Sequence, residues 1–206
     1  MANKKRVFLA VSLEKSIIFS LRKGIAKFKK KTRKISSLIR WLPEKNFHLT
    51  IIFFGYLSLP EIDILREEAK KIFVSQEIFN LFFERICFAP EKKFAKMIWW
   101  RGKRSLELEK IRKELTGKLL NRGLSFSTNN RPLVPHITLA RLKKILPGAP
   151  DISEEFNQEF SVKKIDLFES KLSPQGARYY LLESFPLKNK REANVAQSAE
   201  QLHGKE

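Results

Sequence analysis

The stretches His48-Leu49-Thr50-Ile51 and His136-Ile137-Thr138-Leu139 repeat one pattern, His-x-Thr-x, in two distant parts of the chain. Apolar and β-branched residues surround both stretches, which predicts strands. Successive side chains of a strand alternate between its two faces, so the histidine and the threonine of each stretch share a face. The sequence therefore predicts two copies of a unit that presents an imidazole beside a hydroxyl.

The repetition is more informative than either stretch alone. A single histidine on a strand is more often a hydrogen-bonded interior or surface residue than a reactive one. The chain has three histidines and five threonines, so two matching pairs arise by chance in roughly one case in a thousand. The third histidine, His203, lies in a polar C-terminal stretch. The pattern thus favours one functional site that contains both units.

Composition limits the class of protein. The 206 residues are 43% hydrophobic and 31% charged, which is typical of a globular protein with one core. No apolar run approaches the ~18 residues of a membrane span, and residues 7–13 read as a first strand rather than a signal peptide. The single cysteine, Cys87, excludes an internal disulfide. We expect a cytoplasmic protein.

The net charge is +19 and the pI is about 10.1, so the chain is strongly basic. Such a surplus attracts polyanions, and phosphate neutralisation makes nucleic acid the natural class of partner. The densest basic run is Lys27–Lys34. Dispersed lysines also serve solubility alone, so a role for this run in binding stays open.

Apolar spacing predicts a mixture of helices and strands. The capping-box sequence Ser58-Leu59-Pro60-Glu61 predicts the start of a helix whose inner face carries Leu65, Ala69 and Ile72. Several strands follow one another directly, which favours antiparallel sheets in an α+β fold. The expected strands are 6–13, 46–55, 79–88, 96–101, 135–142, 160–172 and 177–185, and the other expected helices are 14–31 and 105–121.

Each His-x-Thr-x strand follows an amphipathic helix, which indicates an internal pseudo-repeat. We therefore expect a bilobal domain over residues 1–187. Its two antiparallel sheets would be related by a pseudo-two-fold axis, with helices packed outside and a central cleft that holds both histidines. Residues 188–206 are polar and poor in large apolar side chains, so we expect a disordered tail.

Two imidazoles that face each other across a phosphate can perform acid and base catalysis in one step. An unperturbed imidazole has a pKa of ~6.5, so both protonation states exist near neutrality. Threonine hydroxyls can donate hydrogen bonds to the phosphate oxygens. A strained cyclic phosphate is a suitable substrate, and no metal is then obligatory. Neither stretch carries a carboxylate or cysteine at ligand spacing, although distant acidic residues could still converge on a metal.

The sequence resembles the 2H phosphoesterase superfamily, and within it the RNA 2′,3′-cyclic phosphodiesterases, also called 2′-5′ RNA ligases. The resemblance spans residues 6–187. Besides the two motifs, it rests on the segments Arg6–Val11, Arg40-Trp41, Phe53–Gly55, Pro135–Arg141, Ser170–Leu172 and Gly176–Tyr179.

This resemblance implies hydrolysis of a terminal 2′,3′-cyclic phosphate on RNA to a 2′-phosphomonoester. It makes His48 the proton donor and His136 the proton acceptor, with Thr50 and Thr138 as phosphate-binding residues. We expect no cofactor, no metal, no membrane partner and a monomer. The residues themselves leave open a basic RNA-binding protein without catalysis. They also leave open a 2H enzyme that acts on another cyclic nucleotide or as a reversible 2′-5′ RNA ligase.

Four neighbouring residues are expected to lie outside the site, Arg141 as a surface residue or one behind the phosphate ligands and three aromatic residues as packing residues. Simple alternation places Arg141 on the face opposite His136. Trp99 and Trp100 are adjacent and point to opposite faces, so at most one faces the cleft, and core packing is favoured for both. Tyr179 is interpreted in the same way.

Overall fold

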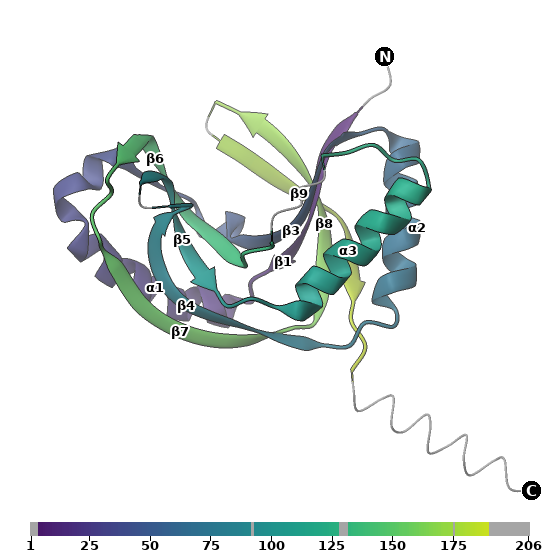
Figure 1. Cartoon of the computed structure of the whole chain (residues 1–206), viewed down its shortest axis with the longest axis horizontal. Helices are drawn as coiled ribbons and strands as arrows, with labels where there is room; N and C mark the ends of the chain where they lie inside the picture. Colours follow the sequence, from purple (N-terminus) through teal and green to yellow (C-terminus); the bar gives the residue numbers. More distant parts are fainter. Residues whose placement is uncertain (1–3, 92, 128–131, 175, 190–206) are drawn as a thin grey trace, which may run out of the picture.

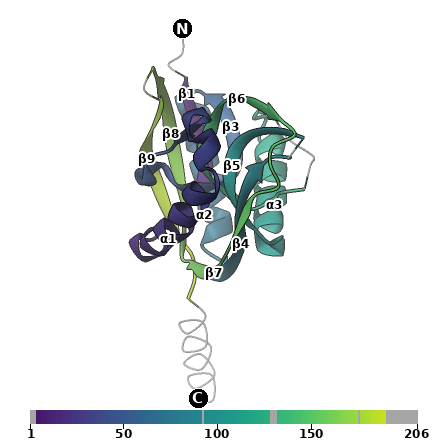
Figure 2. The same cartoon turned by 90° about the vertical axis from the view of Figure 1, so that its left-hand side faces the viewer.

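The computed structural model describes residues 4–91, 93–127, 132–174 and 176–189. Figures 1 and 2 show a strongly curved antiparallel sheet with helices on its outer side. The elements are β1 (Lys5–Ser12), α1 (Lys15–Lys31), the 3-10 turn η1 (Arg33–Leu38), β2 (Ile39–Trp41), the 3-10 turn η2 (Glu44–Asn46), β3 (His48–Leu57), α2 (Leu59–Phe73), β4 (Phe79–Ala89), β5 (Phe94–Gly102), α3 (Leu106–Asn121), β6 (His136–Pro147), β7 (Ser153–Val162), β8 (Lys164–Ser173) and β9 (Gly176–Pro186).

Local sequence accounts for the helices. The predicted capping box at the start of α2 is present, because the Ser58 backbone N–H donates to the Glu61 carboxylate at 2.7 Å and the Ser58 hydroxyl accepts from the Glu61 N–H. The Ser105 hydroxyl caps α3 by accepting from the Leu108 N–H at 3.3 Å. Leu65, one of the predicted inner-face residues of α2, is fully buried.

The strands follow the order β7-β4-β5-β6-β3-β1-β8-β9, and β2 pairs with β6. All of these pairings are antiparallel, so the predicted α+β class is confirmed. Along this order four strands lie on each side of the junction between β6 and β3, and β2 adds a fifth strand on the β6 side. The two predicted sheets are hydrogen-bonded into one at this junction, where Leu49 pairs with Ile137.

The helices connect the two halves of the sheet. Helix α1 follows β1 but packs against β7 and β4, which belong to the other half. Helix α3 follows β5 but lies beside α2 and contacts β3, again across the junction (Figure 1). Each of these two helices thus packs on the half of the sheet opposite to its preceding strand. The units β1-α1-β3 and β5-α3-β6 are therefore equivalent, as a pseudo-two-fold relation requires.

The sequence predicted too few strands after β6. The single strand expected at 160–172 corresponds to parts of two strands, because β7 ends and β8 begins on either side of Lys163. Strand β7 lies at the edge of the sheet and alternates half-buried with exposed residues, so it lacks the apolar run that identifies a strand. The strand predicted at 135–142 also continues to Pro147.

The chain remains attached to the fold at the start of the predicted tail. The Lys188 N–H donates to the Gln76 carbonyl at 2.8 Å, and the Lys188 carbonyl accepts from the Ile78 N–H at 3.0 Å. The rest of the predicted tail from residue 190 on, including His203, lies outside the described residues. None of the helices in the described part of the chain is long and apolar enough to cross a membrane.

Candidate active site

Both motif histidines are held in the same way. The Nδ1 atom of His48 lies 2.8 Å from the Asn46 carbonyl oxygen, and Nδ1 of His136 lies 2.8 Å from the Val134 carbonyl oxygen. A carbonyl only accepts, so each Nδ1 carries the hydrogen and donates it. Each Nε2 is thereby left as an acceptor in the neutral ring and a donor in the protonated ring.

One cavity of about 300 Å³ is lined by all four predicted site residues, His48, Thr50, His136 and Thr138. The Nε2 atom of His48 lies 3.1 Å from the Thr50 hydroxyl oxygen. The cause of this convergence is the Leu49–Ile137 pair, since each of these buried residues stands between the histidine and the threonine of its motif. Their side chains point into the core, so the imidazoles and hydroxyls point the other way.

Matching β-bulges follow the two motifs. In β3, Thr50 is opposite Ala10 and Ile52 is opposite Leu9, so Ile51 is the extra residue. In β6, Thr138 is opposite Trp99 and Ala140 is opposite Ile98, which makes Leu139 the extra residue. The extra residue stands three positions after the histidine in both strands.

The bulges reverse the alternation of side chains. Arg141 therefore returns to the face of His136 and lines the cavity, and the expectation that it lies on the opposite face is wrong. Phe53 returns to the His48 face in the same way. The two pseudo-equivalent positions thus carry an arginine in one half and a phenylalanine in the other.

Aromatic rings enclose the imidazoles. The ring centroids of Phe8 and Tyr179 lie 4.9 Å and 5.0 Å from that of His48. The indole of Trp99 stacks on His136 at 3.7 Å with an interplanar angle of 21°. Trp100 is fully buried in the core, so the packing role expected for both tryptophans is confirmed for Trp100 and wrong for Trp99. Tyr179 also lines the cavity rather than only filling the core.

The environment favours neutral imidazoles. Burial lowers the pKa of His48, the Nδ1 bond to Asn46 opposes this, and the nearby charge of His136 lowers the pKa further. Burial also lowers the pKa of His136, with a smaller contribution from the charge of Arg101. The pKa of each ring therefore lies below its ordinary value.

The cavity has cationic side chains that could meet a phosphate. Arg6 and Arg141 both line it. The Arg6 guanidinium donates to the Ser170 hydroxyl at 2.9 Å and lies 4.4 Å from the centre of the Phe53 ring. Sequence reasoning missed Arg6 as a site residue, because its place beside the first motif strand depends on how β1 pairs with β3. Within the described residues, no three His, Cys, Asp or Glu side chains gather in a group that could hold a metal ion.

Known proteins resemble this chain in sequence. The sequence model of the family described as LigT like Phosphoesterase matches residues 103–179, which include the second motif. The RNA 2′,3′-cyclic phosphodiesterase of Methanocaldococcus jannaschii is 29% identical over 189 residues, covering 87% of this chain and 99% of that protein. The protein of the same name from Thermotoga maritima is 24% identical over 180 residues, covering 86% and 92%.

Solved structures share the fold. The protein TT0787 of Thermus thermophilus matches with a TM-score of 0.76 at 22% identity, covering 90% of this chain and 99% of that one. Escherichia coli LigT complexed with 3′-AMP matches with a TM-score of 0.69 at 24% identity and the same coverage. The likeness to these two structures extends over almost their whole length and shows the fold. The chain is similar to the LigT-like phosphoesterases over residues 103–179 and to RNA 2′,3′-cyclic phosphodiesterases over most of its length, and it is an enzyme.

Proposed function

We propose that this enzyme hydrolyses the terminal 2′,3′-cyclic phosphate of RNA to a 2′-phosphomonoester without a metal ion. The observation that carries the proposal is the meeting of two Nε2-presenting imidazoles and two threonine hydroxyls in one cavity. The relatives are named for this substrate, and the net charge of +19 suits a polyanion.

In the proposed reaction His136 is the general base and His48 is the general acid. A water oxygen attacks phosphorus while the neutral Nε2 of His136 takes the water proton. The P–O3′ bond breaks, and the departing O3′ takes a proton from Nε2 of protonated His48. The two rings exchange protonation states and are reset by proton exchange with solvent. This direction rests on the resemblance to the family, because the pseudo-symmetric arrangement supports either assignment.

The neighbouring polar groups would bind the phosphate. Thr50 and Thr138 lie beside the imidazoles and can donate hydrogen bonds to the two non-bridging oxygens. Arg6 and Arg141 add positive charge to the same cavity, where negative charge increases in the transition state. Enclosure by aromatic rings strengthens these interactions because it excludes water.

Incubation of the purified protein, with EDTA present, with an oligoribonucleotide ending in a cyclic phosphate tests the proposal. The expected product is the 2′-phosphomonoester, separated by chromatography from the 3′ isomer. Formation of the 3′ isomer would reverse the choice of leaving oxygen. An absence of any product, with salt-dependent binding that survives His48→Gln and His136→Gln, would favour the alternative of an RNA-binding protein without catalysis.

A further inference from the structure

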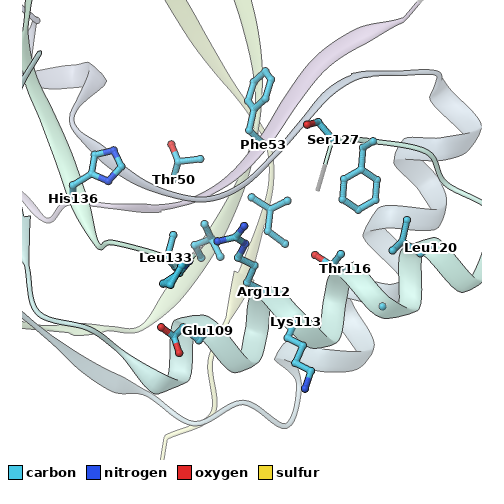
Figure 3. A pocket seen from close by; sticks show the side chains of 15 residues that line it. Thr50, Phe53, Glu109, Arg112, Lys113, Thr116, Leu120, Ser127, Leu133 and His136 are labelled. Atoms are coloured by element: carbon cyan, nitrogen blue, oxygen red, sulfur yellow. The ribbon is translucent and has the colours of Figure 1, made fainter. Parts of the chain in front are cut away.

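A second cavity of about 740 Å³ opens beside the reaction cavity along α3 (Figure 3). Thr50, Phe53 and His136 line both cavities, so the two adjoin at these residues. We call the second cavity the α3 groove. Its volume lies within the range of about 300–1,000 Å³ that small-ligand sites occupy.

The lining of the α3 groove suits a nucleotide. Figure 3 places the Arg112 guanidinium inside the groove below Thr50, whereas Lys113 points away from it. Thr116 and Ser127 add hydroxyls to the lining, and Phe126 and Leu133 add apolar surface. Glu109 also lines the groove, and its carboxylate accepts hydrogen bonds from the Arg104 guanidinium at 2.8 Å and 2.7 Å. The Arg112 guanidinium and the hydroxyls next to apolar surface match a phosphodiester joined to a nucleoside, because each part then meets a complementary group.

Phe53 lies at the entrance between the two cavities and can stack with a base. Its side chain is 40% exposed although it belongs to a central strand, and the Arg6 guanidinium lies 4.4 Å from the ring centre. An exposed aromatic ring beside a cationic groove is the combination that single-stranded nucleic acid uses. The β3 bulge turns the ring to this position.

We propose that the α3 groove binds the nucleotide immediately 5′ to the one that carries the cyclic phosphate. This inference rests on the proposed function and extends it, since it assigns an oligonucleotide rather than a mononucleotide as the preferred substrate. The reaction cavity is small, so an RNA strand whose 3′ end is bound there has to continue outside the cavity. The 5′ carbon lies on the side of the ribose away from both ring oxygens, so the strand can enter the groove without crossing the line of attack.

Gly117 provides the test. It lines the α3 groove from the middle of α3, and an added Cβ would meet no atom within 4 Å. The Cβ of Gly117→Trp therefore meets open space, and its indole is added to reduce the volume of the groove, with Gly117→Ala as the matched control. Two substrates are compared, a dinucleotide ending in a 2′,3′-cyclic phosphate and a nucleoside 2′,3′-cyclic monophosphate. For Gly117→Trp we expect a loss of about tenfold in kcat/KM on the dinucleotide and a change of less than about twofold on the mononucleotide.

Arg112→Gln tests the charge of the groove. It should lower kcat/KM on the dinucleotide and weaken the dependence of KM on salt, because one phosphate contact is removed. Lys110→Gln removes the same charge from an exposed position of α3 outside the groove and should change neither.

Three results would overturn the inference. The first is an equal kcat/KM for both substrates in the unmodified enzyme. The second is an unchanged kcat/KM on the dinucleotide in Gly117→Trp, and the third is an equal loss on both substrates in that variant. A failure of the proposed function would look different, because neither substrate would then be hydrolysed by the unmodified enzyme.

Discussion

Leu49 and Ile137 lie opposite each other where β3 meets β6, and each is the middle residue of a His-x-Thr motif. Continuing the antiparallel register by one residue in each direction directs Thr50 toward His136 and His48 toward Thr138. The Nε2 atom of His48 also lies 3.1 Å from the hydroxyl oxygen of Thr50 in its own motif, so the two imidazoles and two hydroxyls gather in one cavity. The pseudo-two-fold relation of the enzyme passes through this pair, so one buried contact sets the geometry of the reactive groups.

Loss of either imidazole should remove most of the activity. We expect His48→Gln and His136→Gln each to lower kcat about 10²–10⁴-fold on a cyclic-phosphate substrate, because each removes one proton-transfer group. The double variant should be little slower than the slower single variant, since the two rings act in one step. Single-turnover rates provide the measurement. A variant that keeps near-normal turnover would contradict the two-histidine mechanism.

The pH–rate profile should be bell-shaped with its maximum on the acid side of 6.5. The pKa values of His48 and His136 are both lowered, chiefly by burial. The rate should rise with pH as the base loses its proton and fall as the acid loses its own. Because both pKa values are lowered, the midpoints of the rise and of the fall should both lie below the ordinary histidine pKa. Measurements of kcat/KM from pH 4 to 9 check this, with and without EDTA. A rate that keeps rising above pH 8 would contradict it.

Arg141 should contribute to phosphate binding because the β6 bulge directs it into the cavity. We expect Arg141→Gln to reduce kcat/KM about 10–100-fold, equivalent to about 1.4–2.7 kcal/mol of charge-assisted hydrogen bonding. Lys144→Gln removes the same charge from an exposed position of β6 outside the cavity and is the control. Equal activity of the two variants would show that the arginine plays no part.

The junction between the halves of the sheet should be important for stability. Leu49 is fully buried, so Leu49→Ala should lower the free energy of unfolding by about 2–5 kcal/mol. Ile137→Val removes one methylene from the partner and should cost about 0.5–1.5 kcal/mol. Urea denaturation followed by circular dichroism measures both. A loss of less than about 1 kcal/mol for Leu49→Ala would mean that the junction repacks without it.

The sequence predicted the main elements of the site and of the fold because their signals are local. A histidine and a threonine two positions apart on a strand share a face whatever surrounds them. The capping box at Ser58 and the apolar spacing of α1 and α3 likewise depend only on neighbouring residues. Strand β7 was missed because an edge strand with polar alternation lacks such a signal.

The orientation of Arg141 and Phe53 was decided by the tertiary structure. Each follows a bulge, and a bulge exists only when one strand is paired with another. The stacking of Trp99 on His136 and the opening of the α3 groove likewise depend on how the two halves meet. The amino-acid sequence by itself determined that two imidazole–hydroxyl units exist and which residues form them. Their convergence in one cavity, and the side chains that surround them there, follow from packing between segments far apart in the chain, which local periodicity does not encode.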